Sequence, residues 1–283
     1  MTDSSDDLKQ EIREWLIKSG YPLELFAYER LAEAGFFCEK SALYTDIESA
    51  AEREVDIVAE RAYGDHFALE LLVECKKSEK PLVVLASGPE ESFARCEIYG
   101  ARVYPSAFSN AAVLAELGHE RGILSNYATL PFSKKLRSGY SLVQAFKNSD
   151  ELFHRTLYGL AKAEHYFEKQ HEDLFQACAS DKNDKALPIV LHIALLVVDA
   201  LLFNVFLDKG RLEIEEADWA STTLNLPWIQ RPQSDRRGNI QILTKERLAK
   251  FLDELDAFAR WLGNSEMIET VIKRLAHKSS GSV

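Results

Sequence analysis

Two acidic residues and a lysine occur at a spacing that suits a metal-dependent hydrolytic site. Asp56 lies in the segment REVDIVAE, and Glu74, Cys75 and Lys76 lie in succession in LLVECKKS. Alternate side chains of a strand point to opposite faces, so Glu74 and Lys76 share one face and Cys75 takes the other. Carboxylates can hold a divalent cation, and a nearby ammonium can position a water molecule or stabilise developing charge. We therefore take these residues as the candidates for chemistry.

The turn between the two segments determines how they align. If residues 64–66 form a three-residue hairpin loop, Tyr63 faces Phe67 and Asp56 lies directly opposite Glu74. Opposed side chains have Cβ atoms about 5 Å apart. Two carboxylates at that distance repel by roughly 3 kcal/mol at an effective dielectric of about 20. A cation relieves this repulsion, and Mg²⁺ accepts one or two carboxylates while keeping waters for a substrate phosphate.

The same register assigns the neighbouring side chains to faces. Lys76 is expected opposite Glu54, and Glu60 opposite Glu70, where we expect a solvated end of the hairpin. Val55 is expected on the other, aliphatic face, which forms the core. If no site lay over the charged face, that face would be a solvated sheet surface with a pair between Lys76 and Glu54.

Asp56, Glu74, Cys75 and Lys76, on adjacent strands that follow a helix, resemble the signature of the PD-(D/E)XK nuclease superfamily, which has the restriction endonuclease-like fold. The resemblance implies that Asp56 and Glu74 bind a metal ion, with the backbone carbonyl of Cys75 as a further ligand. It implies that Lys76 acts on the attacking water or the transition state. Glu29 is expected to supply the extra glutamate that many members carry on the preceding helix.

The resemblance is closest to bacterial restriction-endonuclease-like proteins that cleave DNA with Mg²⁺ or Mn²⁺, and it covers residues 21–86. Val55 stands where the proline of the motif would be, and the segment ESFARCEIYG lacks the glutamine–tyrosine motif of the exonuclease-like branch. The expected function is a metal-dependent endodeoxyribonuclease. The alternative is a catalytically silent scaffold that binds nucleic acid or a protein partner in a larger complex.

The elements that must position these residues indicate an α/β chain of the mixed α+β type, with a mixed central sheet flanked by helices. Helices are expected over residues 6–19 and 23–34. We expect one nuclease-like domain over 1–283. It would comprise a motif core at about 21–90, a helical insertion at about 90–185, further strands at about 188–226 and a helical tail at about 244–277.

Composition limits the partners. The chain has 283 residues and a formal net charge of −11, which argues against indiscriminate binding to nucleic acid. A nuclease of this charge would need a narrow substrate or recruitment by a protein partner. Two basic stretches are candidate phosphate contacts, namely Lys134, Lys135 and Arg137, and Arg231, Arg236 and Arg237. The acidic amino-terminus favours a cytoplasmic protein with no membrane contact, and the apolar run 187–207 is interpreted as buried strands.

A second metal signal consists of two Glu-x-x-His units, Glu151 with His154 and Glu168 with His171. Such units occur in di-iron helical bundles. On one continuous helix the two units would lie about 25 Å apart at 1.5 Å per residue. They are therefore not expected to share a cluster.

Overall fold

The computed structural model describes residues 3–64, 67–86, 101–104, 138–147, 151–179, 189–227 and 237–263. Its helices are α1 (Asp3–Lys18), α2 (Tyr21–Glu33), α5 (Glu151–Ala179) and α6 (Lys245–Gly263). Its strands are β1 (Phe37–Thr45), β2 (Glu52–Ala62), β3 (Phe67–Lys77), β4 (Leu82–Ala86), β5 (Ala101–Tyr104), β6 (Ser138–Gln144), β7 (Ile189–Asp199), β8 (Leu202–Asp208), β9 (Arg211–Ala217), β10 (Trp219–Asn225) and β11 (Arg237–Thr244).

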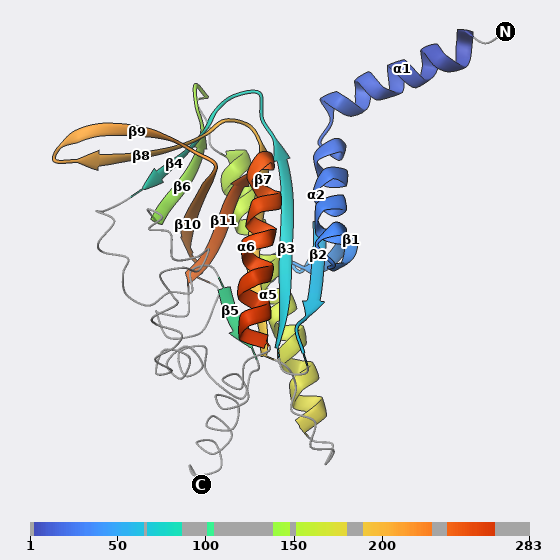
Figure 1. The fold of residues 1–283 in the computed structure, drawn as a ribbon. Helices are drawn as coiled ribbons and strands as arrows, with labels where there is room; N and C mark the ends of the chain where they lie inside the picture. Colours follow the sequence, from blue (N-terminus) through green and yellow to red (C-terminus); the bar gives the residue numbers. More distant parts are fainter. Residues whose placement is uncertain are drawn as a thin grey trace.

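These strands form one mixed sheet in the order β1-β2-β3-β7-β11-β10-β6-β4-β8-β9, with β5 paired to β7 beside this path. The strands β1, β2 and β3 are antiparallel neighbours, whereas β7 runs parallel to β3 and β11 runs parallel to β7. Helices cover the sheet, which confirms the expected α+β class with a mixed central sheet (Figure 1).

Two apolar clusters bind the helices to the sheet. One face of β3 and β7 packs against α2 and α6, and its cluster includes Leu71 and Val73. The other face packs against α5, and its cluster includes Leu72 and Leu196. Because β7 is buried on both faces, its sequence is almost continuously apolar, with His192 as the one polar side chain before Asp199. The interpretation of the apolar run as buried strand is confirmed for β7, whereas β8 is only partly buried and Leu207 is exposed. No described helix is long and apolar enough to cross a membrane.

Helix α6 fulfils the expected pattern of the carboxy-terminal segment. Leu248, Phe251, Leu252, Leu255 and Phe258 recur at helical spacing, and all are buried against the sheet. The rest of the predicted tail, residues 264–277, lies outside the described residues.

The predicted helical insertion is only partly correct. Residues 151–179 form α5, but β5 and β6 are strands within the same stretch, and residues 105–137 lie outside the described part of the chain. The strand β11 was not predicted, because Gln241 interrupts its apolar pattern. That side chain is buried, and its carbonyl oxygen accepts a hydrogen bond from the Trp219 indole at 2.8 Å, so it sits in the core as a paired polar group.

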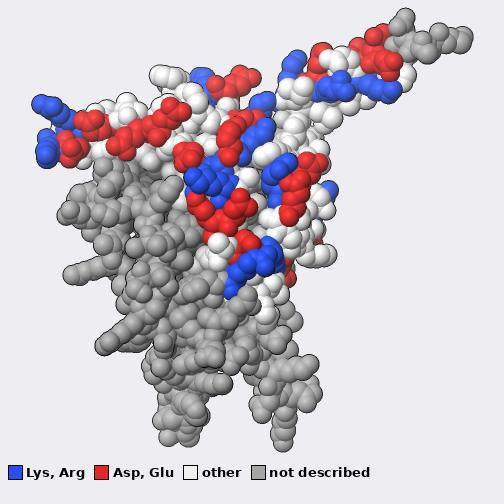
Figure 2. All heavy atoms as spheres, viewed as in Figure 1, with Lys and Arg blue, Asp and Glu red and all other residues white. Residues whose placement is uncertain are grey.

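Acidic and basic side chains are interspersed over the described surface in the view of Figure 2. The projecting β8–β9 hairpin carries exposed acidic residues along β9, namely Glu213, Glu215 and Glu216, with Lys209 and Arg211 near its tip. The described part of this face therefore offers no broad basic surface to a phosphate backbone.

Candidate metal-binding site

The register of the β2–β3 hairpin is the expected one. Ile57 pairs with Val73, Val58 with Leu72, and Glu60 with Glu70. Near the turn, the Tyr63 amide donates to the Phe67 carbonyl at 2.8 Å. Pairing of the two strands ends at Ile57 and Val73, so Asp56 and Glu74 are the first residues beyond the ladder.

The alternation of side chains between the two faces of β2 is interrupted at Asp56. Ile57 lies on the α2 side of the sheet, whereas Val55 lies on the α5 side. Lys40 pairs with Ile57 and Ala42 with Val55, which leaves Ser41 opposite Asp56 outside the paired positions. Ser41 has a φ of 55°, in the left-handed region that non-glycine residues rarely adopt. Ala42 and Val55 pack in the α5-side cluster, so the expected placement of Val55 on the other face is wrong.

The Asp56 carboxylate occupies the position where the ladder would otherwise continue. It accepts a hydrogen bond from the Cys75 amide at 2.7 Å. The amide and carbonyl of one strand residue point to the same side of the strand. The Cys75 carbonyl therefore faces the gap between β2 and β3 together with Asp56, as a metal ligand at this position requires.

Glu74 and Lys76 complete the group. The Lys76 ammonium lies 2.6 Å from the Glu74 carboxylate, and the two side chains are 29% and 16% exposed. The expected pair between Lys76 and Glu54 is not the one observed, and Glu54 is exposed. Burial and the charge of Asp56 raise the pKa of Glu74 to about 7. Burial also raises the pKa of Asp56, so both carboxyl groups resist ionisation without a cation.

The helix glutamate beside this site is Glu24, and the expected role of Glu29 is not supported. Glu29 is exposed on α2, whereas Glu24, in the first turn, is partly buried. Burial and the charge of Asp56 raise the pKa of Glu24, and the charge of Lys76 opposes the rise. Glu24 lies in the first turn of α2, which begins at Tyr21 rather than residue 23.

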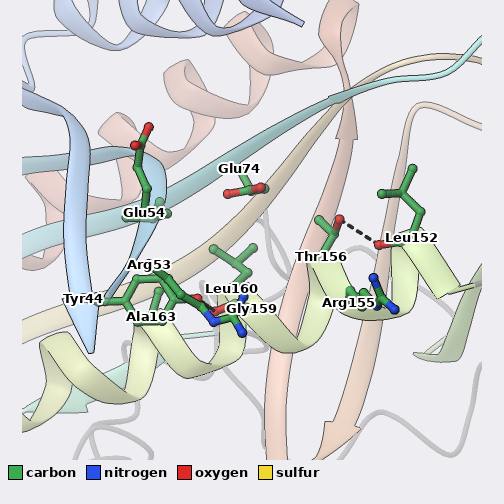
Figure 3. Close-up of a pocket in the computed structure, with 11 residues that line it drawn as sticks. Tyr44, Arg53, Glu54, Glu74, Leu152, Arg155, Thr156, Gly159, Leu160 and Ala163 are labelled. Atoms are coloured by element: carbon green, nitrogen blue, oxygen red, sulfur yellow. Dashed lines mark hydrogen bonds between the residues drawn. The ribbon is translucent and has the colours of Figure 1, made fainter. Parts of the chain in front are cut away.

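A pocket of about 360 Å³ opens beside Glu74. It lies between the β1–β2 hairpin and the amino-terminal half of α5, with Tyr44, Thr156 and Leu160 in its wall. Figure 3 shows Glu74 on the strand side and the guanidinium groups of Arg53 and Arg155 along the α5 side. A phosphate group in this pocket would lie close to cationic groups on one side and to the Glu74 carboxylate on the other.

Arg53 is held in place by a buried aspartate. The Asp46 side chain is 2% exposed, lies 2.8 Å from the Arg53 guanidinium and 3.0 Å from the Lys162 ammonium on α5. Burial alone would raise the pKa of Asp46, but hydrogen bonds from Lys162 and from the Glu48 and Ser49 amides hold it well below its usual range. These contacts fasten the tip of the β1–β2 hairpin to α5 and so form one wall of the pocket.

We expect Asp46→Asn to lower the free energy of unfolding by about 2–4 kcal/mol at pH 7, because it leaves the Lys162 ammonium without its buried counter-charge. The native pKa of Asp46 lies below its unfolded value of 3.8. Its stabilising contribution is therefore complete above about pH 4 and declines as the pH falls further. Urea denaturation at several pH values measures the free energy of unfolding of both proteins. The control is Glu48→Gln, because Glu48 also pairs with Lys162 but is 53% exposed; an equal loss in both variants would contradict the assignment.

Glu70 was expected at a solvated end of the hairpin, and this expectation is wrong. The side chain is buried beneath α5. Its carboxylate lies 2.9 Å from Nε2 of His171 and 2.7 Å from Nδ1 of His192. His171 belongs to one of the Glu-x-x-His units, yet Glu168 of that unit contacts His165 instead. The two units lie on one continuous helix, as the expectation required. The sequence does not predict that His192 lies beside Glu70, since only the parallel pairing of β3 with β7 brings the two residues together.

Six basic residues of the two basic stretches are candidates for phosphate contacts. Residues 134, 135, 137, 231 and 236 lie outside the described part of the chain, and Arg237 begins β11. The Lys77 ammonium donates to the Ile17 carbonyl at 2.7 Å, and that of Lys80 to the Phe146 carbonyl at 3.3 Å.

No family model, no curated protein and no solved structure matches this chain.

Proposed function

We propose that this protein is a metal-dependent nuclease that hydrolyses phosphodiester bonds, with DNA as the expected substrate. Asp56, Glu74 and the Cys75 carbonyl would hold Mg²⁺ or Mn²⁺, and Lys76 would act beside them. The observation that carries the proposal is that two partly buried carboxyl groups, Asp56 and Glu74, lie together with the Lys76 ammonium 2.6 Å from Glu74, and that the pKa of Glu74 is raised to about 7 there. An arrangement that resists its own ionisation gains stability only when a cation or proton joins it.

The chain's own groups have distinct roles in this proposal. A bound ion would stabilise charge on phosphate oxygens and lower the pKa of a water molecule. A Glu74 carboxylate that held the ion would leave its present pair with Lys76, so the Lys76 ammonium could orient the attacking water or stabilise the developing charge. Arg53 and Arg155 line the pocket where the phosphate would lie.

The order of elements also supports the proposal. In chain order, a helix (α2) and three antiparallel strands (β1–β3) are followed, after β4–β6, by a helix (α5) and a strand parallel to β3 (β7). The helices α2 and α5 lie on opposite faces of the sheet. This arrangement agrees with the mixed sheet flanked by helices that the PD-(D/E)XK resemblance implies. The net charge of −11 favours a narrow substrate or recruitment by a partner, in the cytoplasm, over indiscriminate DNA binding.

One observation favours the alternative of a silent scaffold. Without an ion, Glu74 already pairs with Lys76, and Asp56 already accepts a hydrogen bond from Cys75. The deciding experiment incubates the purified protein with supercoiled plasmid, linear duplex, single-stranded DNA and RNA, in Mg²⁺, Mn²⁺ or EDTA. Cleavage that requires the ion and disappears in Asp56→Asn supports the nuclease. Binding without cleavage of any substrate supports the scaffold.

A further inference from the structure

A second group of metal-ligating side chains lies in the core, away from the carboxylate site. Glu70 on β3, His171 on α5 and His192 on β7 converge so that each carboxylate oxygen faces one imidazole nitrogen. The two imidazole rings meet edge to face with centroids 5.0 Å apart. One ligand atom from each residue lies within 4.8 Å of the others.

Most of this cluster lies in the protein core rather than on the surface. Glu70 is 4% exposed and His192 is fully buried, and the two residues are directly paired neighbours on β3 and β7. The side chain of His171 is 26% exposed, which leaves one open side. Burying a carboxylate and two imidazoles is costly unless the groups are paired or coordinate a metal ion.

The donor set identifies the class of ion. Two imidazoles and one carboxylate are a recurrent protein ligand set for Zn²⁺ and for other divalent first-row transition ions. Zn²⁺ binds such atoms at about 2.0–2.2 Å, so a tetrahedral ion needs ligand atoms about 3.4 Å apart. Small side-chain adjustments meet this requirement from the observed spacing. Mg²⁺ prefers oxygen ligands and would not be favoured here.

The cluster is separate from the carboxylate site. Glu70 and Glu74 are four residues apart on β3, which places their Cα atoms about 13 Å apart along the strand. One ion cannot contact both. Glu60 lies directly opposite Glu70 in the neighbouring strand and is exposed, so it or a water molecule can provide a fourth ligand.

We infer that Glu70, His171 and His192 bind one divalent transition-metal ion of the Zn²⁺ class, which fastens α5 to strands β3 and β7. The ion would stabilise the packing of the same helix whose amino-terminal half lines the pocket beside Glu74. This inference does not depend on nuclease activity.

The test measures metal content directly. The protein is dialysed against EDTA, loaded with Zn²⁺ or Co²⁺, desalted and analysed by plasma mass spectrometry, and the visible absorption of bound Co²⁺ is recorded. We expect one ion per wild-type chain. In Glu70→Gln and His171→Gln, affinity should fall at least about 100-fold. Because His171 is partly exposed, His171→Gln should leave the folded chain intact.

Two controls separate this site from its surroundings. His165→Gln changes a histidine of the same helix that contacts Glu168 rather than the cluster, and it should keep its ion. Asp56→Asn should also keep its ion while losing Mg²⁺-dependent cleavage, so the two proposals can fail separately. Equal Co²⁺ content in wild type and His171→Gln would overturn the inference and leave a hydrogen-bonded network only.

Discussion

Replacement of Lys76 by alanine is expected to lower kcat/KM for DNA cleavage at least about 100-fold, because a positioned charge that stabilises a transition state is typically worth 10²–10³ in rate. Asp56→Asn should cost more, about 1,000-fold or beyond, which corresponds to about 4 kcal/mol of transition-state stabilisation. It removes a metal ligand and one of the two charges that attract the ion. Initial rates of plasmid nicking at saturating Mg²⁺ or Mn²⁺ measure both effects.

The chain provides matched lysine controls. Lys77 and Lys80 lie close by in the sequence, but their ammonium groups bind backbone carbonyls away from Glu74. Lys77→Ala and Lys80→Ala should therefore retain cleavage within about 3-fold, as expected for changes outside the reacting group. Circular dichroism must show that all variants are folded. If Lys77→Ala lost as much activity as Lys76→Ala, general electrostatic attraction of DNA would explain the data and the assigned role of Lys76 would be wrong.

The second large effect concerns stability. In the absence of metal at pH 8, we expect the free energy of unfolding of Glu74→Gln to be about 1–3 kcal/mol higher than that of wild type. The difference between a pKa of about 7 in the folded state and 4.5 in the unfolded state is equivalent to about 3 kcal/mol. Glutamine keeps the shape and still accepts a hydrogen bond from Lys76, but it carries no charge next to Asp56.

The pH dependence follows from the sign of this shift. The folded state binds the Glu74 proton more tightly than the unfolded state does, so wild type loses stability as the pH rises from about 4.5 to about 7. The advantage of Glu74→Gln should be absent below about pH 4.5 and complete above about pH 7. Millimolar Mn²⁺ should stabilise wild type and not the variant.

Urea denaturation across this pH range tests the effect, with Glu213→Gln as the control. Glu213 is an exposed carboxylate of β9, distant in the sheet order from β3, so its neutralisation should change stability by less than about 0.5 kcal/mol. A wild-type protein that is more stable than Glu74→Gln at pH 8 without metal would contradict the account.

The sequence was sufficient to predict the hairpin register and the meeting of Asp56 with Glu74. The turn fixed the register, because a three-residue loop leaves one way to pair Tyr63 with Phe67, and the apolar face of β3 then excludes a slip. The buried strand β7 and the amphipathic helix α6 were predictable for the same reason, since burial determines their patterns.

Other features required the folded chain. The interruption of the strand pattern beside Asp56 involves Ser41, a non-glycine residue with a left-handed backbone, which no local sequence pattern predicts. Val55 therefore lies on the face opposite to the expected one. The approach of Glu24 in place of Glu29 depends on which side of α2 faces the sheet, and that side carries Leu23, Ala27 and Leu31. His192 meets Glu70 only through parallel pairing across more than a hundred residues of intervening chain, a contact that sequence periodicity does not encode.

Crystals soaked in Mn²⁺ and measured at the manganese absorption edge test the central claim most directly, because the anomalous signal locates the ion without reference to activity. The account predicts a peak between the carboxylates of Asp56 and Glu74 and the carbonyl of Cys75, with Lys76 turned away from Glu74. A map with no peak there, and with Lys76 still paired to Glu74, would contradict it.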